Sequence, residues 1–411
     1  MGDLAVRQIG EDDFADYLRC MGTGFHFGRD VSDERVEFMR THFTDTARYG
    51  AYVDGALSGT TGAFMTELTV PGDRVVPCSA VTQVTVLPTH RRRGLLTEMM
   101  GVHLADAVDG GAVVAMLIAA EWPIYGRFGY GMAVEAAGTV LDARAARFVD
   151  ATRSGSIELV DAATLRALAP AVFDQHRLTS PGAISRGDDQ WDVFLDIVLR
   201  PGDDPPKHRV RAIHRDAGGA VDGYVVYDPD ERWDHNRPFI TLSTDQMLAT
   251  NDAAYRDLWR YLAEVDWVSE VKAGVRPVDE PLGHLLVDGR AARQIDRSDH
   301  MWVRLLDVPA ALQARAYSTP VSVVLDVIDN VGPAGGRFAL DTDLAGAACA
   351  PTDAGADLRL GLDALGAAYL GGTRLWKFAA AGQIEELTPG SLAALDRAMQ
   401  TTRAPWATTN F

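Results

Sequence analysis

The sequence has 411 residues, of which 47% are hydrophobic and 23% are charged, a balance typical of globular rather than disordered proteins. A chain of this length exceeds one ordinary domain, so we expect two or three domains. The net charge of −18 at pH 7 opposes binding to nucleic acid and to anionic membranes. It favours small cationic partners, or serves only to keep the protein soluble.

The first block, residues 1 to about 145, mixes helix and strand signals. Apolar residues recur at helical spacing after Leu95, and an apolar run beyond them is typical of a strand in the middle of a covered sheet. The expected elements are helices at 11–21 and 36–43, strands at 52–53 and 56–57 around the Asp54-Gly55 turn, a hairpin of 60–70 with 74–87, a helix from 95, and a strand at 112–119.

The second block, about 150 to 295, repeats this order of elements although the letters differ, which predicts a second domain of the same fold. The expected elements are helices at 162–175 and 191–199, strands at 208–214, 220–227 and 239–248, a helix at 252–265, and a strand at 268–273.

The last block, about 300 to 411, indicates a small α+β domain, and its pattern alone says little about function. Short strands alternate there with glycine-rich turns before two helices. The expected elements are strands at 322–328, 337–340 and 358–362 and helices at 362–370 and 391–399.

Signals for export, membrane insertion and metal binding are weak. No apolar run reaches the roughly 18 residues that a membrane span needs, and the start, Met1 to Leu4, lacks the pattern of a secretion signal, so we expect a cytoplasmic protein. Cys20, Cys78 and Cys349 are widely spaced and form no Cys-x-x-Cys pair, so we expect buried thiols and no metal site.

The segment from Gln83 to Leu96 is the most informative. A strand ends, a basic turn follows, and a helix opens at Gly94. Helix N-termini leave about four backbone N–H groups unpaired and carry about half a positive charge, so they attract phosphate. The nucleotide pattern ending in Gly-Lys-Ser/Thr and the dinucleotide Gly-x-Gly-x-x-Gly pattern are both absent. The segment predicts a phosphate-bearing ligand; the alternative is a solvated basic turn.

This segment resembles motif A of the GNAT acetyltransferases, Arg/Gln-x-x-Gly-x-Gly/Ala, although its last position is Leu96 rather than a small residue. The resemblance implies acetyl-CoA as the donor, held partly by backbone groups of the preceding strand. The cofactor-binding residues expected from it are Val84, Thr85, Val86, Arg91, Arg92, Arg93, Gly94, Leu95 and Leu96.

The second block lacks the loop. Its helix begins after Thr250-Asn251, with no arginines, and Asp252 would repel a phosphate there. We therefore expect one coenzyme site per chain, in the first block.

A tyrosine-bearing segment, Glu121 to Gly131, follows the apolar strand. Acetyl transfer to an amine requires a proton for the departing thiolate, and a tyrosine beside the thioester can donate it. Tyr125 follows the strand that would part from 83–87, and Tyr130 is the competing candidate. Either ring could instead be a packing residue.

Thr89 to Leu96 and Ile124 to Gly131 together resemble the Eis family of aminoglycoside N-acetyltransferases, and 301–312 adds to the likeness. The resemblance covers the whole chain and implies an α/β (mixed α+β) fold class: tandem GNAT-like domains followed by a sterol-carrier-protein-like α+β domain. We place these domains at 1–147, 148–296 and 297–411, the last ending in the active site.

The family resemblance also implies roles. It makes Tyr125 the general acid and the terminal carboxylate of Phe411 the general base, whereas an ordinary chain end would be frayed. It implies acetylation of aminoglycosides at several positions, antibiotic resistance and a homohexamer.

The acceptor pocket is expected to involve Phe25, His26, Phe27, Glu121 and Trp122, with Asp30 or Asp33 as its aspartate. Several residues depart from the family pattern, and they put the acceptor range in doubt rather than the chemistry. They are Ala120, which replaces a serine, Trp122-Pro123, which replaces two glycines, and Asn410, which replaces an acidic residue.

Two other functions remain open. One is a GNAT enzyme that acts on lysine side chains or on a single small-amine metabolite. The other is a lipid- or ligand-binding module built on the C-terminal block.

Overall fold

The structure is a computed structural model that describes residues 3–343 and 345–411. Met1 and Gly2, which belong to the segment Met1 to Leu4 that was predicted to lack a secretion signal, lie outside the described residues. The chain divides into two compact units. Unit 1 comprises Met1–Val134, His300–Thr402 and Thr409–Phe411, and unit 2 comprises Glu135–Asp299 and Arg403–Thr408.

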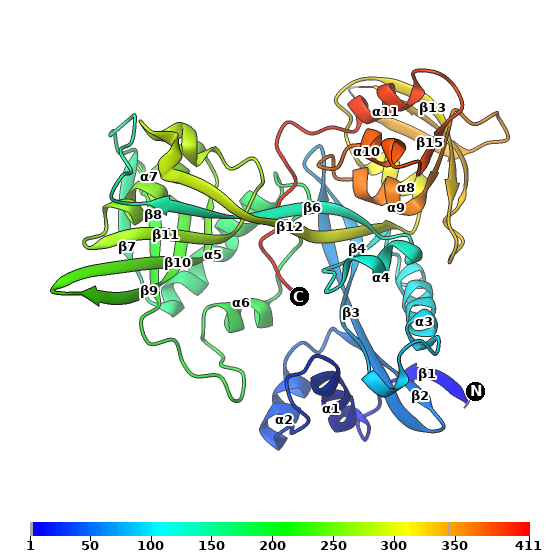
Figure 1. Cartoon of the computed structure of the whole chain (residues 1–411), viewed down its shortest axis with the longest axis horizontal. Coiled ribbons are helices and arrows are strands. Elements are labelled where there is room, and N and C mark those ends of the chain that lie inside the picture. Colours follow the sequence, from blue (N-terminus) through cyan, green and yellow to red (C-terminus); the bar gives the residue numbers. More distant parts are fainter. Residues whose placement is uncertain (1–2, 344) are drawn as a thin grey trace. The chain divides into compact units, whose positions relative to one another are not determined.

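The N-terminal part of unit 1 alternates strands and helices much as expected (Figure 1). In order, it contains β1 (Leu4–Gln8), α1 (Phe14–Gly24), α2 (Asp33–Thr41), β2 (Ala47–Val53), β3 (Ala56–Val70), β4 (Arg74–Val86), η1 (Pro88–His90), α3 (Leu95–Asp109), β5 (Val114–Leu117), α4 (Trp122–Tyr125), η2 (Gly126–Phe128) and the start of β6 (Gly131–Asp142). The expected helices and both hairpins are confirmed, with ends that move by a few residues. The strands β1 and β6 were not predicted.

The sheet of unit 1 follows from its turns. Asp54 and Gly55 both have positive φ, 51° and 81°, which is the backbone that a tight two-residue hairpin between β2 and β3 requires. β1 pairs antiparallel with β2, β3 with β4, and β5 lies parallel to β4. The C-terminal half of β12 (Ala292–Leu305) then pairs antiparallel with β5, so a late strand completes the early sheet.

The C-terminal part of unit 1 is the small α+β domain that the sequence predicts. Its five-stranded sheet has the order β15-β14-β13-β16-β17, with short helices packed on it (Figure 1). Its elements are α8 (Val308–Ala314), β13 (Val321–Ile328), β14 (Gly336–Thr342), β15 (Ala347–Pro351), β16 (Leu358–Gly361), α9 (Leu362–Ala368), α10 (Leu375–Ala380), β17 (Ile384–Glu386) and α11 (Ser391–Ala398).

Unit 2 repeats the element order of the first domain. It contains the rest of β6, β7 (Gly155–Leu159), α5 (Ala162–Arg177), α6 (Asp188–Phe194), β8 (Val210–Asp216), β9 (Val221–Asp234), β10 (Arg237–Ala249), α7 (Asp252–Glu264), β11 (Val268–Arg276), η3 (Pro281–Leu285), η4 (Gly289–Ala291) and the start of β12. Antiparallel pairing joins β7, β8, β9 and β10, and β11 is parallel to β10.

One predicted helix of unit 2 is misplaced. The sequence suggested 191–199, whereas α6 is Asp188–Phe194. The helix cannot continue because Asp196 has a left-handed backbone, with φ of 61°. The carboxylate of Asp196 pairs with Arg211 on β8 and with Arg209 just before that strand.

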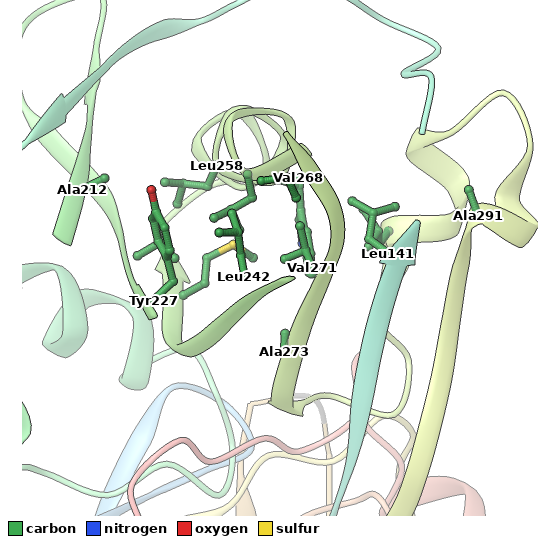
Figure 2. Packing of buried hydrophobic residues seen from close by; sticks show 14 of the residues in the cluster. Leu141, Ala212, Tyr227, Leu242, Leu258, Val268, Val271, Ala273 and Ala291 are labelled. Atoms are coloured by element: carbon green, nitrogen blue, oxygen red, sulfur yellow. The ribbon is translucent and has the colours of Figure 1, made fainter. Parts of the chain in front are cut away.

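The core of unit 2 lies between α7 and its strands. Figure 2 shows Leu242, Leu258 and Val271 directed toward one another from two strands and the helix. Trp259 is also fully buried in this cluster. Burial of such side chains stabilises a fold by about 1.5–3 kcal/mol each, so this interface holds α7 on the sheet.

The cysteines behave as expected, since Cys20, Cys78 and Cys349 are free and buried. Among the described residues, no helix is both long enough and apolar enough to cross a membrane. No group of three or more His, Cys, Asp or Glu side chains in the described part of the chain is arranged to hold a metal ion.

Candidate active site

Strand β4 parts from β5 in the region predicted to bind the cofactor. Their parallel pairing runs from Cys78 opposite Val114 to Val81 opposite Leu117, where β5 ends. β4 continues to Val86 and stays paired with β3 on its other side. Val84, Thr85 and Val86 therefore lie on a strand whose β5-side edge is open to an extended ligand.

A bulge lies at the start of this open stretch. Gln83 has φ of 57°, and the register between β3 and β4 shifts between Thr60 and Gly62. The hydroxyl of Thr60 donates a hydrogen bond of 2.8 Å to the Gln83 carbonyl. The bulge thus turns the strand at a defined place.

The helix start after β4 has the features of an anion site. Gly94 precedes α3 with φ of 88°, and no side chain caps the first turn in the part of the chain that the structure describes. Arg91, Arg92 and Arg93 are exposed beside it. The free N–H groups, the helix dipole and three guanidinium groups all favour phosphate, so this donor set fits the pyrophosphate of a coenzyme.

The two leucines predicted to bind cofactor are placed differently. Leu95 is 2% exposed and packs with Ala51 and Met99, so its backbone N–H rather than its side chain can meet a ligand. Leu96 is half-buried and packs against two apolar clusters.

The equivalent helix start in unit 2 is closed. Asn251 precedes α7, and its side-chain oxygen accepts hydrogen bonds from the backbone N–H groups of Ala253 and Ala254. Asp252 adds negative charge in the first turn. This end offers a phosphate neither free donors nor favourable charge.

Tyr125 ends α4 and packs in the apolar cluster that includes Val81, with half-buried Val84 against it. Burial, and secondarily the carboxylate of Glu121, raise the pKa of Tyr125 to about 12. Its hydroxyl is therefore protonated at neutral pH, as a proton donor must be.

Tyr130, the competing tyrosine, lies deeper. It is 0% exposed, and its ring meets that of Tyr125 edge-on, with centroids 6.2 Å apart. Burial raises its pKa, while the charge of Arg304 lowers it. Among the described residues its hydroxyl has no hydrogen-bond partner.

Sequence reasoning missed Arg304, on β12. Its Nη1 donates to the carbonyl of Phe128 at 2.5 Å, and its Nη2 pairs with Asp329 at 2.6 Å; both charged side chains are 1% exposed. A Cβ at Gly129 would lie 2.2 Å from Nη1, so only glycine fits there. The C-terminal domain thus holds the loop that carries Tyr125. Residues 301–312 drew attention by their likeness to a family, but no local signal reveals this long-range contact.

The predicted acceptor residues fall in two segments. Glu121 and Trp122 stand exposed beside Tyr125, and Trp122 packs edge-on against Trp302, with ring centroids 4.9 Å apart. The others form the loop after α1. There the rings of Phe25 and Phe27 stack at 5.8 Å, and Phe27 is 81% exposed.

The remaining residues of the loop after α1 are polar and accessible. His26 has φ of 62° and is exposed, and so are Asp30 and Asp33. Asp33 lies in the first turn of α2, which Ser32 caps. The structure favours neither aspartate.

The C-terminal segment is packed rather than frayed. In unit 2, Trp406 lies in an apolar cluster and under the guanidinium of Arg276, 4.6 Å from its ring. In unit 1, the ring of Phe411 meets Phe64 edge-on, with centroids 5.6 Å apart, and Phe64 lies opposite Ala80 on β4. The terminal residue therefore rests on the sheet that also contains β4.

Comparisons with known families agree with this architecture. Residues 5–133 and residues 182–315 each match an acetyltransferase (GNAT) domain, and residues 308–408 match a sterol carrier protein domain. The expected fold class, two GNAT-like domains followed by a sterol-carrier-like domain, is confirmed.

Individual relatives match nearly the full chain. An uncharacterized N-acetyltransferase of Streptomyces avermitilis is 39% identical over 414 residues, which cover 100% of this chain and 99% of the relative. N-acetyltransferase Eis of Mycobacterium tuberculosis is 38% identical over 341 residues, or 80% of each chain. The crystal structure of Eis1 from Mycobacterium abscessus superimposes with a TM-score of 0.86 at 32% identity and covers 100% of both chains.

Proposed function

Because the chain belongs to the Eis family of GNAT N-acetyltransferases, we propose that it transfers acetyl groups from acetyl-CoA to amino groups of polycationic acceptors such as aminoglycosides, at one or several positions. The observation that carries the proposal is the uncapped start of α3 at Gly94, beside the open edge of β4 and the protonated Tyr125.

The coenzyme is held by this chain's backbone and guanidinium groups. The N–H groups at the start of α3 and the side chains of Arg91, Arg92 and Arg93 bind the phosphates. Val84 and Val86 offer backbone groups to the extended pantetheine arm. Acetyl-CoA, when bound, supplies an acetyl group activated as a thioester.

Two groups of the chain move the protons. An α-carboxylate is ordinarily ionised at neutral pH, so that of Phe411 can accept a proton from the acceptor's ammonium group and pass it to solvent. As the C–N bond forms and the C–S bond breaks, Tyr125 donates its hydroxyl proton to the departing sulfur. It recovers a proton from the acylated nitrogen, leaving an amide, a free thiol and the unchanged enzyme.

The acceptor is recognised by its charge. The protein's net charge of −18 attracts polycations, and Glu121 stands exposed beside Tyr125. The stacked rings of Phe25 and Phe27 offer faces to which ammonium groups bind by cation–π attraction. These features support an acceptor that carries several ammonium groups.

We extend the proposal to the setting of the enzyme. It acts in the cytoplasm, assembles as a homohexamer, comprises domains at 1–147, 148–296 and 297–411, and confers antibiotic resistance on its host. Light scattering on the purified protein tests the hexamer, since a monomer mass would contradict it. Growth of an expressing strain on aminoglycosides tests the resistance.

The central test is thiol release from acetyl-CoA with a panel of aminoglycosides, lysine-bearing peptides and small amines, followed by mass spectrometry of the products. More than one acetyl group on an aminoglycoside is the expected result. Turnover of only a peptide or a small amine would support the acetyltransferase activity and contradict the proposed aminoglycoside acceptor. If no amine is acetylated and acetyl-CoA does not bind, the proposal fails.

The role of the terminal carboxylate has a separate test. Deleting Thr409–Phe411 is expected to abolish turnover while acetyl-CoA binding, measured by calorimetry, persists. Unchanged turnover by the shortened chain would assign the base to another group.

A further inference from the structure

A buried tyrosine of α1 is bonded to the bulge in β4. Tyr17 is 0% exposed, and its hydroxyl donates a hydrogen bond of 2.8 Å to Oε1 of Gln83. Burial raises the pKa of Tyr17, so the hydroxyl stays a donor at every working pH. The side chain of Gln83 is thereby held by a helix that lies outside the sheet.

Gln83 is held at a second point through its backbone. Its φ of 57° is unfavourable for a residue other than glycine, and such a backbone persists only where neighbours impose it. Thr60 on β3 holds the carbonyl, at 2.8 Å. Tyr17 and Thr60 together fix the residue at which β4 opens.

The end of α1 also touches β4. Gly24 is its last residue, and a Cβ there would lie 2.1 Å from Oγ1 of Thr85, so the helix packs on β4 with no space for a side chain. α1 therefore contacts β4 twice, in its first turn through Tyr17 and at its end through Gly24.

The loop that follows is folded tightly onto this helix end. The N–H of Phe25 donates to the Met21 carbonyl at 3.0 Å, and that of Phe27 donates to the Gly22 carbonyl at 2.8 Å. A Cβ at Gly22 would lie 2.5 Å from the carbonyl oxygen of Gly28. The two phenylalanine rings are thus carried by a rigid extension of α1.

We propose that Tyr17 and Gln83 are positioning residues whose hydrogen bond, together with the contact of Gly24 on Thr85, joins β4 and the loop after α1 that carries Phe25 and Phe27 into one rigid piece. The inference rests on the proposed function and deepens it. It assigns to a side-chain pair the task of keeping the acceptor amine in register with the thioester, which transfer between two bound reactants requires.

The test uses three variants of the full-length protein. Tyr17→Phe removes only the hydroxyl, Gln83→Gly removes the side chain but suits the positive φ, and the third variant combines them. Tyr317→Phe is the matched control, because that buried hydroxyl donates to the Leu312 carbonyl at 2.8 Å and bonds neither Gln83 nor the loop after α1. Steady-state kinetics for both substrates are measured, together with amide hydrogen exchange of residues 22–28 without substrates.

Each single variant is expected to raise the KM of the amine and of acetyl-CoA, or to lower kcat, by about five-fold, the value of one hydrogen bond. The double variant should be no worse than Gln83→Gly, because both changes remove the same bond. The amides of Phe25 and Phe27 should exchange at least about five-fold faster in Tyr17→Phe but not in Tyr317→Phe.

Two results would overturn the inference. One is Tyr17→Phe with both KM values and kcat within about two-fold of wild type and unchanged exchange, since the bond would then serve the fold alone. The other is a double variant whose losses multiply, because the two residues would then act separately. A wild-type protein that acetylates no amine is a different result, which refutes the proposed function itself whatever the exchange data show.

Discussion

Helices α3 and α7 follow corresponding strands in two copies of one fold, and their first residues differ in chemistry. α3 begins at a left-handed glycine without a side-chain cap among the described residues, next to three arginines. α7 begins at Asn251, whose side chain satisfies two of its free N–H groups, and Asp252 follows. The same order of elements thus leads to a helix start that favours anions in one copy and to a closed helix start in the other, and the cap backbone differs as well, with φ of 88° at Gly94 and −151° at Asn251.

The interiors of the two helices differ as well. His103 and Arg260 each lie eight residues after the first residue of their helix, Leu95 and Asp252. His103 is 2% exposed, and burial lowers its pKa to about 4, so it is neutral. Arg260 instead belongs to a buried charged network. The helix of the second copy thus carries a buried ion pair between Asp257 and Arg260.

The largest expected effect comes from Tyr125, the proposed general acid, which lies in the first copy. Tyr125→Phe should lower kcat about 10²- to 10⁴-fold, the usual worth of a general acid, while acetyl-CoA affinity stays within about two-fold. Steady-state kinetics and calorimetry check both values. Tyr130→Phe is the matched control. A loss of similar size in that variant, with Tyr125→Phe active, would move the acid to Tyr130.

The next effect concerns the charged network of unit 2. The carboxylate of Asp257 accepts from the N–H and hydroxyl of Ser154, both at 2.7 Å, and pairs with Arg260 at 3.1 Å. Asp257→Ala would leave buried Arg260 without its carboxylate and should cost about 3–5 kcal/mol of unfolding free energy.

The unfolding free energy of unit 2, measured from amide hydrogen exchange in β8 at increasing denaturant concentration, checks that cost. The kcat of the folded protein should not change. Glu264→Ala is the control, because its pair with Arg153 is exposed and should contribute less than about 1 kcal/mol. Equal costs for the two variants would show that the network adds nothing beyond a surface pair.

Lowering the pH should reduce the free energy of unfolding of the first copy, because His103 is buried there. Its folded pKa of about 4 lies below the ordinary 6.5, so the unfolded chain takes up the proton first as pH falls. The stability from the neutral ring is complete above pH 6.5 and decreases toward pH 4, by about 3 kcal/mol in all. Unfolding free energies between pH 7 and 4 measure this loss. His103→Leu should reduce it, whereas His176, whose pKa burial also lowers to about 4, should keep its own share. An unchanged slope in that variant would assign the acid sensitivity elsewhere.

The smallest effect tests the caps directly. Gly94→Asn places a side chain beside the free N–H groups of α3, and asparagine tolerates the left-handed backbone there, so acetyl-CoA affinity should fall about ten-fold as that side chain obstructs the approach of the phosphates. The reciprocal Asn251→Gly should cost only a few tenths of a kcal/mol and create no coenzyme site. Unchanged affinity in Gly94→Asn, measured by calorimetry, would mean that the arginines alone hold the phosphates.

Much of this fold follows from local sequence. The turn at Asp54-Gly55, the hairpin of β3 with β4 and the start of α3 depend on neighbours a few residues apart, and each was predicted. The strands β1, β6, β7, β12, β15 and β17 were missed. β12 begins with mostly exposed residues, so its first half lacks the alternation that marks a strand, and only pairing with distant β5 defines its end.

The candidate site divides in the same way. Gly94 and its arginines were recognisable because the features that favour phosphate at a helix start come from consecutive residues. The contact of Arg304 with Phe128, the bond from Tyr17 to Gln83 and the packing of Phe411 on Phe64 join residues 176, 66 and 347 positions apart in the chain (411 − 64 for the last). No pattern of one segment can predict such pairs.

The sequence by itself determined the order of the domains, the place of the basic helix start at Gly94 and the different helix start of the second copy, because all three depend on residue type at short spacing. The tertiary structure decided which contacts hold the candidate site in place. These are the contacts that fix the bulge in β4, the hydrogen bond from Arg304 to the Phe128 carbonyl and the packing of Phe411 on Phe64. These depend on close contacts between remote segments, which packing creates only when the whole chain folds.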